Sequence, residues 1–426
     1  MGGLAFVSHI LSIKTPRMSR EVYNKALKQN QAILRGFYSK VASAIEGPGK
    51  TTYGDVDILV ALPLKDAFSS EERVADRLKK ALNAVAWIQD KGSPTINFAV
   101  PWPKNSIAGD GDVVGEGGGE LDESTDAASE EWYVQVDVHT CKDEHEFGWE
   151  LFHSSHGDLW NIIGTTIRRF GLTVNNRALF IRIPEIELAD RKKSMLFLTD
   201  EPTKILDFLG LDEEKWWKRF STRQEMFEYA ASCRMFSVKD IVEGEVKERK
   251  KLKHNDRQRM TKRPTFKAWV DEFIPQCRKE RKYGDSKITR KEIRNEVFEK
   301  FGVKGEYETR QQEWNLKRHL MELTRDGIKG NIPLDTVDGQ MRLAAIKVLK
   351  GIIIDGEPYE GSVPKAAMKD ENGFYDLELV KHFVIENWEN AGRAGMARQQ
   401  VKIREVMKAK AEINAKAKAE QDYALQ

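Results

Sequence analysis

Gly49-Lys50-Thr51-Thr52-Tyr53-Gly54-Asp55-Val56-Asp57-Ile58-Leu59-Val60 is a glycine- and hydroxyl-rich turn followed directly by a β-branched segment. This order is typical of a loop that enters a buried strand. Because side chains alternate along a strand, Asp55 and Asp57 point to one face. Val56, Ile58 and Val60 point to the other face. The stretch therefore predicts a strand with carboxylates on one side and hydrophobic core on the other.

The spacing of Asp55 and Asp57 indicates a metal site. Two carboxylates this close repel each other and are costly to keep charged in a partly buried place unless a cation lies between them. Hard oxygen ligands, with no thiolate or imidazole pair in the strand, favour Mg²⁺ (or Mn²⁺) over Zn²⁺. The alternative is an edge strand whose polar face is merely solvated, which is the commoner origin of an Asp-x-Asp pair.

A third aspartate follows in Trp132-Tyr133-Val134-Gln135-Val136-Asp137-Val138-His139, whose alternation predicts a second strand. Asp137 is the only carboxylate in this stretch, and such a placement calls for a charged partner nearby. If this strand pairs beside Asp55 and Asp57, three carboxylates converge. Such a triad can hold two metal ions that activate an attacking hydroxyl and stabilise a leaving pyrophosphate. This is the chemistry of nucleotidyl transfer.

Length and composition allow several domains but identify no partner. The chain has 426 residues, enough for two or three domains, and a formal net charge of only +2. Its three cysteines, Cys141, Cys233 and Cys277, are widely spaced, which argues against a disulfide framework and for a reducing, intracellular compartment. No apolar run is long enough for a membrane helix. A nuclear or cytoplasmic location is favoured over a mitochondrial one, although the basic N-terminus weakly permits a leader.

The motifs resemble the family X (DNA polymerase β-like) branch of the nucleotidyltransferase superfamily. The Gly-Lys turn leading into Gly-Asp-x-Asp, the strand around Asp137, and the later segments up to about residue 220 occur in the order of that family. Asn161 falls where the family places an asparagine near the nucleotide. The Ile205-Leu206-Asp207-Phe208-Leu209-Gly210-Leu211 stretch resembles the family's closing subdomain.

The resemblance implies an α+β core, with a mixed sheet flanked by helices. Helical patterns after residue 265 predict a separate, mainly helical C-terminal domain. The resemblance implies that Asp55 and Asp57 hold both metal ions, and that Asp137 binds the catalytic ion and deprotonates or orients the acceptor. The substrate would be a nucleoside triphosphate and the acceptor a nucleic acid, with DNA and RNA both open. Phosphate contact is expected from the loop, whose backbone N–H groups can cradle an anion. The expected nucleotide-binding residues are Gly49, Lys50, Thr51, Thr52, Gly54 and Asn161.

Two departures keep a second function open. The family carries a Gly-Ser pair and an arginine upstream of the Gly-Lys turn, where this chain has Ala44-Ile45-Glu46-Gly47-Pro48. Its Tyr-Phe-x-Gly-Ser element is replaced here by His153-Ser154-Ser155-His156-Gly157. Without fixed donors for the triphosphate, stabilisation of the leaving group is weakened. The alternative is therefore a catalytically silent nucleic-acid-binding or scaffold protein on the same fold.

The rest of the chain is expected to form further segments. Residues 1–46 are expected to form an N-terminal arm followed by a helix that runs from Ser19 to about Ile45. Residues 47–184 are expected to form the catalytic core. Residues 185–242 are expected to form a closing subdomain with an aromatic core. An acidic, glycine-rich loop at 109–131 is expected to be disordered. Residues 243–264 predict a basic linker and 265–426 a helical domain. Within the linker, the cationic run Lys247–Arg263 is a solvated connection, a localisation signal or a nucleic-acid contact.

Overall fold

The computed structural model describes residues 5–6, 13–68, 71–104, 131–238, 263–284, 288–334, 337–358 and 368–424, with side chains to residue 416. The acidic loop expected at 109–131 lies outside these residues except for Glu131. The basic segment Lys247–Arg263 lies outside them except for Arg263.

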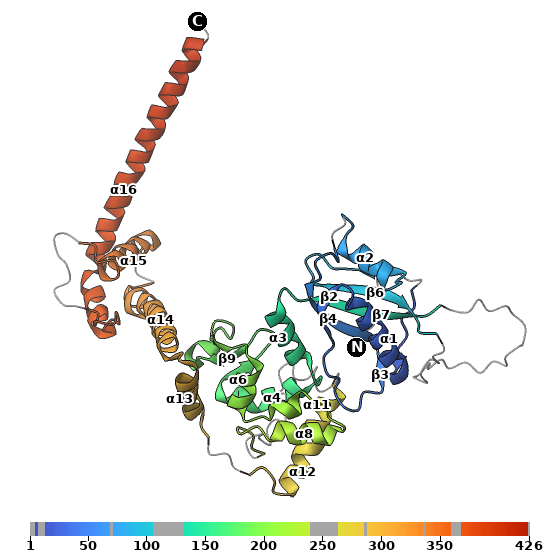
Figure 1. Ribbon diagram of the computed structural model, residues 1–426. Coiled ribbons are helices and arrows are strands. Elements are labelled where there is room, and N and C mark those ends of the chain that lie inside the picture. Colours follow the sequence, from blue (N-terminus) through green and yellow to red (C-terminus); the bar gives the residue numbers. More distant parts are fainter. Residues whose placement is uncertain are drawn as a thin grey trace, which may run out of the picture. The chain divides into compact units, whose positions relative to one another are not determined.

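The chain divides into two compact units, shown as ribbons in Figure 1. One comprises Met1–Pro184 and Arg191–Val303, and the other comprises Glu185–Asp190 and Lys304–Gln426. This division reflects internal contacts and does not test independent folding, so the domain boundaries expected at 47, 185, 243 and 265 stay predictions.

Within the described residues, the largest sheet of the first unit has five strands in the spatial order β2-β4-β7-β6-β5. They are β2 (Tyr38–Ala42), β4 (Asp55–Pro63), β5 (Ala86–Ile88), β6 (Thr95–Pro101) and β7 (Tyr133–Thr140). The β4–β7 pair is parallel and the other neighbouring pairs are antiparallel, so the sheet is mixed. The short strands β1 (Met18–Ser19) and β3 (Thr52–Tyr53) pair separately.

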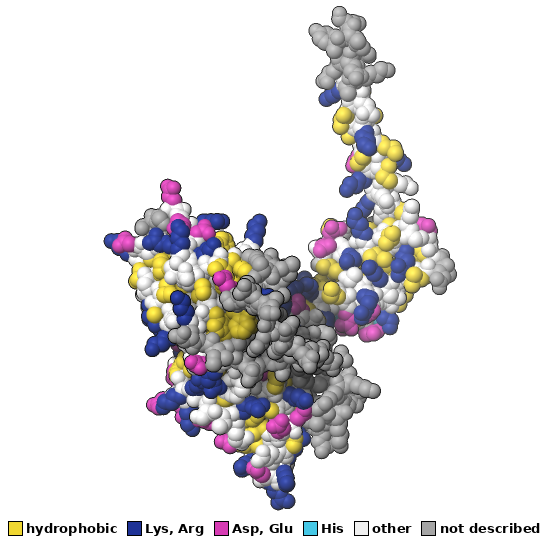
Figure 2. Space-filling model, turned by 90° about the vertical axis from the view of Figure 1, so that its right-hand side faces the viewer, with side chains coloured by type: hydrophobic (Ala, Val, Ile, Leu, Met, Phe, Trp, Pro, Cys, Tyr) yellow, Lys and Arg dark blue, Asp and Glu magenta, His cyan; other side chains and the backbone are white. Residues whose placement is uncertain are grey.

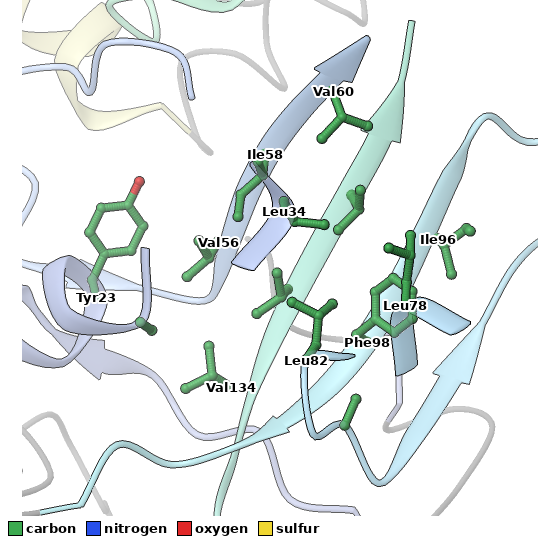
Figure 3. Packing of buried hydrophobic residues seen from close by; sticks show 14 of the residues in the cluster. Tyr23, Leu34, Val56, Ile58, Val60, Leu78, Leu82, Ile96, Phe98 and Val134 are labelled. Atoms are coloured by element: carbon green, nitrogen blue, oxygen red, sulfur yellow. The ribbon is translucent and has the colours of Figure 1, made fainter. Parts of the chain in front are cut away.

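Helices α1 (Arg20–Leu34) and α2 (Val74–Ala81) cover one face of this sheet. Val56, Ile58 and Val60 of β4 are fully buried in the core that these helices close. Alternate residues of β7 and β6 join the same core, where Val134 and Phe98 pack with side chains of both helices (Figure 3). The alternation expected along β4 is therefore observed, with its apolar residues in the core.

The opposite face of β4 is covered only in part. Leu59 and Ala61 are buried there with Cys141 and with Phe147 of helix α3 (Glu144–Ser154). Asp55 and Asp57 precede these residues on the same face and keep contact with solvent. Asp55 and Asp57 therefore lie on the face of β4 that α3 covers only in part.

The N-terminal helix is shorter than expected. Ser19 caps it as predicted, because its side chain accepts a hydrogen bond from the Val22 backbone N–H at 3.3 Å. The helix ends at Leu34, however, and the expectation that it reaches Ile45 is wrong. Residues 38–42 form β2, which pairs antiparallel with β4. Their apolar residues occur by coincidence at helical spacing, and pairing with the sheet outweighs the local pattern.

The remainder of the first unit combines a small antiparallel sheet with short helices. The strands, in the order β10-β9-β8, are β8 (Leu172–Val174), β9 (Leu179–Arg182) and β10 (Met195–Thr199). The helices are α4 (Leu159–Ile167), η1 (Arg168–Phe170), α6 (Pro202–Leu209), α7 (Glu213–Trp216), α8 (Arg223–Ala231), α11 (Pro264–Ala268), η2 (Trp269–Phe273), α12 (Ile274–Lys279) and α13 (Arg290–Phe301). The fully buried Trp216 packs against Phe152 and Trp160, with ring centroids 4.7 and 5.1 Å apart. Both partners precede residue 185, so the aromatic cluster around Trp216 is not confined to the segment 185–242, and the subdomain boundaries stay a prediction.

The second unit is helical. Its elements are α14 (Lys304–Glu322), η3 (Leu323–Ile328), η4 (Lys329–Asn331), α15 (Gly339–Ile353) and α16 (Leu377–Ala424), and α5 (Pro184–Glu187) lies at its junction with the first unit. The sequence suggests two helices after residue 377 and a helix end at Gly351. Instead, α16 is continuous and α15 runs past Gly351. Apolar and basic side chains alternate along the exposed length of α16 (Figure 2).

The expected fold class is confirmed. The protein is α+β, with a mixed sheet flanked by helices and a mainly helical C-terminal region. None of the helices in the described ranges is both long and apolar enough to cross a membrane.

Candidate functional site

Asp57 and Asp137 lie opposite each other on the parallel pair of strands. In the register of β4 and β7, Asp57 is the partner of Asp137, and Asp55 is the partner of Gln135. Partner residues on adjacent strands project from the same face of a sheet. The structure thus brings together two of the three aspartates expected to act, one from each strand.

Two amide side chains hold the carboxylate of Asp137. The Asn97 side chain on β6 donates from Nδ2 to Asp137 Oδ1 at 2.6 Å. The Gln135 side chain donates from Nε2 to both Asp137 oxygens, at 2.9 and 3.1 Å. Gln135 is itself buried, and its Oε1 accepts from the Ala5 backbone N–H at 3.1 Å. Because both donors come from the sheet, the carboxylate has a fixed orientation.

The two aspartates are partly desolvated and crowded by negative charge. Burial, followed by the charges of Asp55 and Asp137, raises the pKa of Asp57 to about 7. Burial also raises the pKa of Asp137 to about 6, although the bonds from Asn97 and Gln135 act in the opposite direction. Asp57 still reaches solvent, but it does so inside a pocket whose walls remove part of its hydration.

A pocket of about 360 Å³ surrounds these carboxylates, and we call it the carboxylate pocket. Glu46 and Glu150 line it together with Asp57 and Asp137, and Lys50 is its only lysine or arginine among the described residues. The pKa of the Glu150 carboxyl is raised by burial and by the charge of Glu146. The pocket therefore gathers carboxyl groups whose charge is offset either by protonation or by a bound cation.

Glu46 and Lys50 form an ion pair on the wall of the pocket. Lys50 Nζ lies 2.8 Å from Glu46 Oε2 and 4.7 Å from the centroid of the Tyr53 ring. Tyr23 stacks on Tyr53 and donates from its hydroxyl to Glu46 Oε1 at 3.1 Å. The charge of Lys50 lowers the pKa of Asp57, so the ammonium group is close enough to act on the carboxylates. Lys50 thus lines the carboxylate pocket, and its contact with phosphate stays a prediction.

The other loop residues are placed less directly at the pocket. Gly49 has a φ of +79°, and a Cβ atom there would lie 3.3 Å from Arg223 Nε, so the position requires glycine. Arg20 Nη2 donates to the Lys50 carbonyl at 3.0 Å. Arg17 donates to the Thr52 hydroxyl and carbonyl, both at 2.9 Å. The expected loop residues that do not line the pocket are Gly49, Thr51, Thr52 and Gly54.

The segment His153–Gly157, which differs from the family pattern, forms another wall. The backbone N–H of His156 donates to the Ile45 carbonyl at 2.6 Å, and Ser155 Oγ accepts from the Ile45 N–H at 3.1 Å. His156 is fully buried, and its Nε2 lies 2.6 Å from the Trp216 carbonyl. Because Nε2 donates that bond, Nδ1 is unprotonated, and burial lowers the pKa of the imidazole. Gly157 and Ser154 both line the carboxylate pocket.

Asn161 does not line the carboxylate pocket. It lies on α4 and lines a neighbouring pocket that shares Ser154 and Gly157 with the first. Asn161, which the resemblance singles out, therefore lines the pocket next to that of the aspartates, and Ser154 and Gly157 lie between the two pockets.

The donor set suits Mg²⁺ or Mn²⁺, although it is not a complete site. Among the described residues, no three or more His, Cys, Asp or Glu side chains group closely enough to hold a metal ion. Asp57 and Asp137 offer two carboxylates, and Mg²⁺ is commonly bound by one or two carboxylates with substrate phosphates and water. Oxygen donors in excess negative charge favour such a hard cation. The residues present thus fit a metal that arrives with its substrate.

Several residues of the pocket escape prediction from the sequence. Asn97 reaches Asp137 only through the pairing of β6 with β7, which no short motif encodes. Gln135 lies two residues before Asp137 on the same face of β7. Glu46 and Glu150 lie outside the aspartate strands and meet them in the folded chain. The alternation along β6 and β7 places Asn97 and Gln135 on polar positions, and this is the one signal that could have suggested them.

Comparisons with known proteins identify no family for this chain. No family model matches the chain, and no curated protein matches its sequence. The solved structures that match include a Leishmania infantum polymerase beta in a ternary gap complex, with a TM-score of 0.31 and 14% sequence identity. That match covers 50% of this chain and 73% of the other. A likeness of this degree supports no conclusion about activity or ligands.

Proposed function

We propose that the protein is a metal-dependent nucleotidyltransferase that transfers a nucleotidyl group from a nucleoside triphosphate to a hydroxyl, with the 3′ end of a nucleic acid as the acceptor. The observation that carries the proposal is the pairing of Asp57 with Asp137 in register on parallel strands, at the wall of a pocket with excess negative charge. The Gly-Lys loop that enters the same strand supports it.

Asp57 and Asp137 would hold the divalent cation, with Asp55 adding negative charge beside them. When bound, the cation supplies electrostatic stabilisation of the charge that develops on the phosphate oxygens. The acceptor hydroxyl oxygen forms a bond to the α-phosphorus, and the bond from the α-phosphorus to the pyrophosphate oxygen breaks. Asp137 takes or orients the hydroxyl proton, a role for which the hydrogen bonds from Asn97 and Gln135 fix the carboxylate.

Lys50 would contact the phosphates of the donor. Its ammonium group is held at the pocket by Glu46, and a bound triphosphate offers stronger anionic acceptors than one carboxylate. Arg20 and Arg223 border the loop from other elements, through the Lys50 carbonyl and beside Gly49. They supply cationic groups near the position where the family's upstream arginine is absent.

The test is nucleotide transfer. Purified protein is incubated with Mg²⁺ or Mn²⁺, labelled triphosphates, and single- and double-stranded DNA and RNA primers. We expect product with the native protein and loss of product in Asp137→Asn. The exposed Asp90, which lines neither pocket, provides the matched control Asp90→Asn, which should retain activity. Transfer that persists undiminished in Asp137→Asn would exclude the proposed role.

The second candidate is the catalytically silent nucleic-acid-binding protein. It is favoured by the ion pair that already engages Lys50 with Glu46, since this pair occupies the one ammonium group of the pocket. Calorimetry separates the two functions. Mg²⁺-dependent binding of triphosphate supports the enzyme, and nucleic-acid binding without triphosphate binding or turnover supports the silent protein.

A further inference from the structure

A second pocket, of about 410 Å³, lies against the carboxylate pocket and has the opposite charge. Three arginines line it, Arg168, Arg191 and Arg263, together with Asn161 and Thr173. Among the described residues that line it, none is Asp or Glu. We call it the arginine pocket. Cationic groups gathered around a polar cavity favour an anionic ligand.

A fourth arginine lies beneath this pocket. Arg182 on β9 is only 1% exposed, and its guanidinium donates to the Arg168 carbonyl at 2.5 Å and to the Leu172 carbonyl at 2.8 Å. It also donates to the Thr173 hydroxyl. All three acceptors belong to residues that line the pocket. A buried guanidinium therefore fixes the pocket wall and adds positive potential beneath it.

The arginine cluster continues behind Arg182. Arg290 on α13 donates from Nη2 to the Arg182 carbonyl at 3.1 Å. Its guanidinium also packs against Gly171, where a Cβ atom would lie 2.8 Å from Nη2 and where φ is +84°. The positive φ favours glycine there, and the missing Cβ leaves room for the Arg290 guanidinium. The fold thus accommodates several like charges in one region.

Asp158 orients the outer side of the pocket. Its Oδ1 accepts from Arg263 Nη1 at 2.6 Å and from Asn161 Nδ2 at 3.4 Å. Asp158 itself does not line the cavity. Arginine is suited to bidentate binding of phosphate, and the Asp158 carboxylate engages one nitrogen of the Arg263 guanidinium, for which a phosphate would compete. Arg263 is also the described end of the basic segment predicted to contact nucleic acid.

We propose that the arginine pocket binds a phosphate group, and that the group belongs to the nucleic-acid acceptor. Ser154 and Gly157 line both pockets, so a ligand with several phosphates can occupy the two at once. The carboxylate pocket would take the reacting groups, and the arginine pocket would take a backbone phosphate of the acceptor. This assignment of the source rests on the proposed function, whereas phosphate binding itself does not.

Binding measured without metal tests the proposal separately from catalysis. The probes are a short fluorescein-labelled single-stranded oligonucleotide, as DNA and as RNA, and inorganic pyrophosphate, in buffer that contains a metal chelator. The variant is Arg191→Gln/Arg263→Gln, at two exposed positions whose replacement leaves the core intact. The matched control is Arg35→Gln/Arg73→Gln, which removes the same charge from exposed positions that line neither pocket.

We expect the pocket variant to bind the oligonucleotide on the order of ten-fold more weakly or worse, because hydrogen bonds between charged groups are lost. Its slope of log affinity against log salt should flatten by about 1.4, or about 0.7 for each lost contact to a single strand. The control variant should retain the native affinity and slope.

Each other outcome is decisive. Loss of pyrophosphate binding with oligonucleotide binding intact would assign the pocket to the donor's phosphates. If both double variants bind the oligonucleotide equally weakly, the effect is one of overall charge and the proposed site is wrong. The proposed site is also wrong if the pocket variant binds the oligonucleotide as tightly as the native protein. If oligonucleotide binding depends on the arginines and no variant or native protein transfers nucleotides, the proposed function fails and the pocket stands.

Discussion

The carboxylate pocket and the arginine pocket share a wall, yet they are built in different ways. In the first, the charged groups project from paired strands of the main sheet, and their positions follow from the β4–β7 register. In the second, the arginines come from η1, the segment before β10 and the residue before α11. The difference shows that the first pocket depends on strand alternation and the second on the long-range packing of irregular segments.

The two pockets also differ in the charged groups that oppose their main charge. The carboxylate pocket has four carboxylates against Lys50, and the pKa of Asp57 and of Asp137 is raised. The arginine pocket has Asp158 behind Arg263, outside the cavity lining. Among the described lining residues, the carboxylate pocket has more acidic than basic side chains and the arginine pocket has basic side chains without an Asp or Glu. A cation suits the first and an anion the second, so one metal-phosphate ligand complements both.

Loss of one carboxylate should have the largest effect. Asp57→Asn keeps the size of the side chain and removes a charge and a metal ligand, so transfer should fall by about 10²–10⁴-fold. Repulsion between Asp57 and its neighbours is also removed, so the melting temperature of the metal-free protein should not fall. Steady-state rates and thermal melts with a chelator measure the two quantities. A variant that melts lower and loses activity only in proportion to its folded fraction would contradict the proposed role.

Metal addition should distinguish the pockets by stability. A cation that binds the folded protein at about 100 times its dissociation constant adds about 2.7 kcal/mol to the free energy of unfolding. Because the site fits a metal that arrives with its substrate, we expect Mg²⁺ together with a nucleoside triphosphate to raise the melting temperature of the native protein and of Arg191→Gln/Arg263→Gln. The increase should disappear in Asp57→Asn/Asp137→Asn. A rise of the same size in that variant would place the cation elsewhere.

The amide that holds Asp137 should matter less than the carboxylate. Asn97→Ala removes the 2.6 Å hydrogen bond but leaves the donors from Gln135. Groups that orient a metal ligand typically contribute about 10–100-fold to metal affinity or activity. The metal concentration that gives half-maximal activity should increase, whereas oligonucleotide affinity in chelator should not change. A loss of oligonucleotide affinity instead would indicate disturbance of the shared wall.

The sequence predicts the carboxylate pocket better than the arginine pocket, for a physical reason. Period-two alternation places Asp57 and Asp137 on the same kind of strand face, and the Gly-Lys turn marks the entry to β4. Alternation within β7 also places Gln135 on the face of Asp137. Neither signal gives the strand order, so the contact of Asn97 with Asp137 cannot be predicted before β6 and β7 pair. Arg191 and Arg263 belong to segments without periodicity, and their proximity is a property of the fold alone.

The N-terminal helix illustrates the same limit. Residues 38–42 fit a helical spacing, but they pair with β4 instead and form the edge strand beside the site. Local periodicity cannot distinguish the two states for so short a segment, and tertiary pairing decides between them. The strand brings Glu46 and Lys50 to the pocket, which an unbroken helix to Ile45 would not do.

Acid should weaken the wall that the pockets share. Burial lowers the pKa of His156, so the folded protein keeps this imidazole neutral. The unfolded chain binds a proton there below about pH 6.5, so His156 contributes a decrease in the free energy of unfolding as the pH falls below that value. The raised pKa values of Asp57 and Asp137 contribute a change of opposite sign, so the test is the difference between two proteins that both keep these aspartates. His156→Asn, which tolerates the φ of 64°, should show a shallower fall between neutral and acid pH. His153, whose pKa burial also lowers, supplies a remaining slope in both proteins. Identical pH profiles of melting temperature would refute the role of His156.

The smallest effect is expected from Asp158, which competes with a ligand phosphate for Arg263. Asp158→Asn keeps an oxygen that can accept from Arg263 and Asn161 but removes the negative charge. Because ion pairs of exposed arginines contribute about 0–1 kcal/mol, oligonucleotide affinity should rise by up to about 5-fold at low salt. The gain should vanish at high salt and should be absent when Arg263 is also replaced by glutamine. Weaker binding in Asp158→Asn would mean that the carboxylate holds Arg263 in place more than it competes with phosphate. The arginine pocket would then need its acidic neighbour in order to bind an anion, whereas the carboxylate pocket must have its charge offset by a cation from solution.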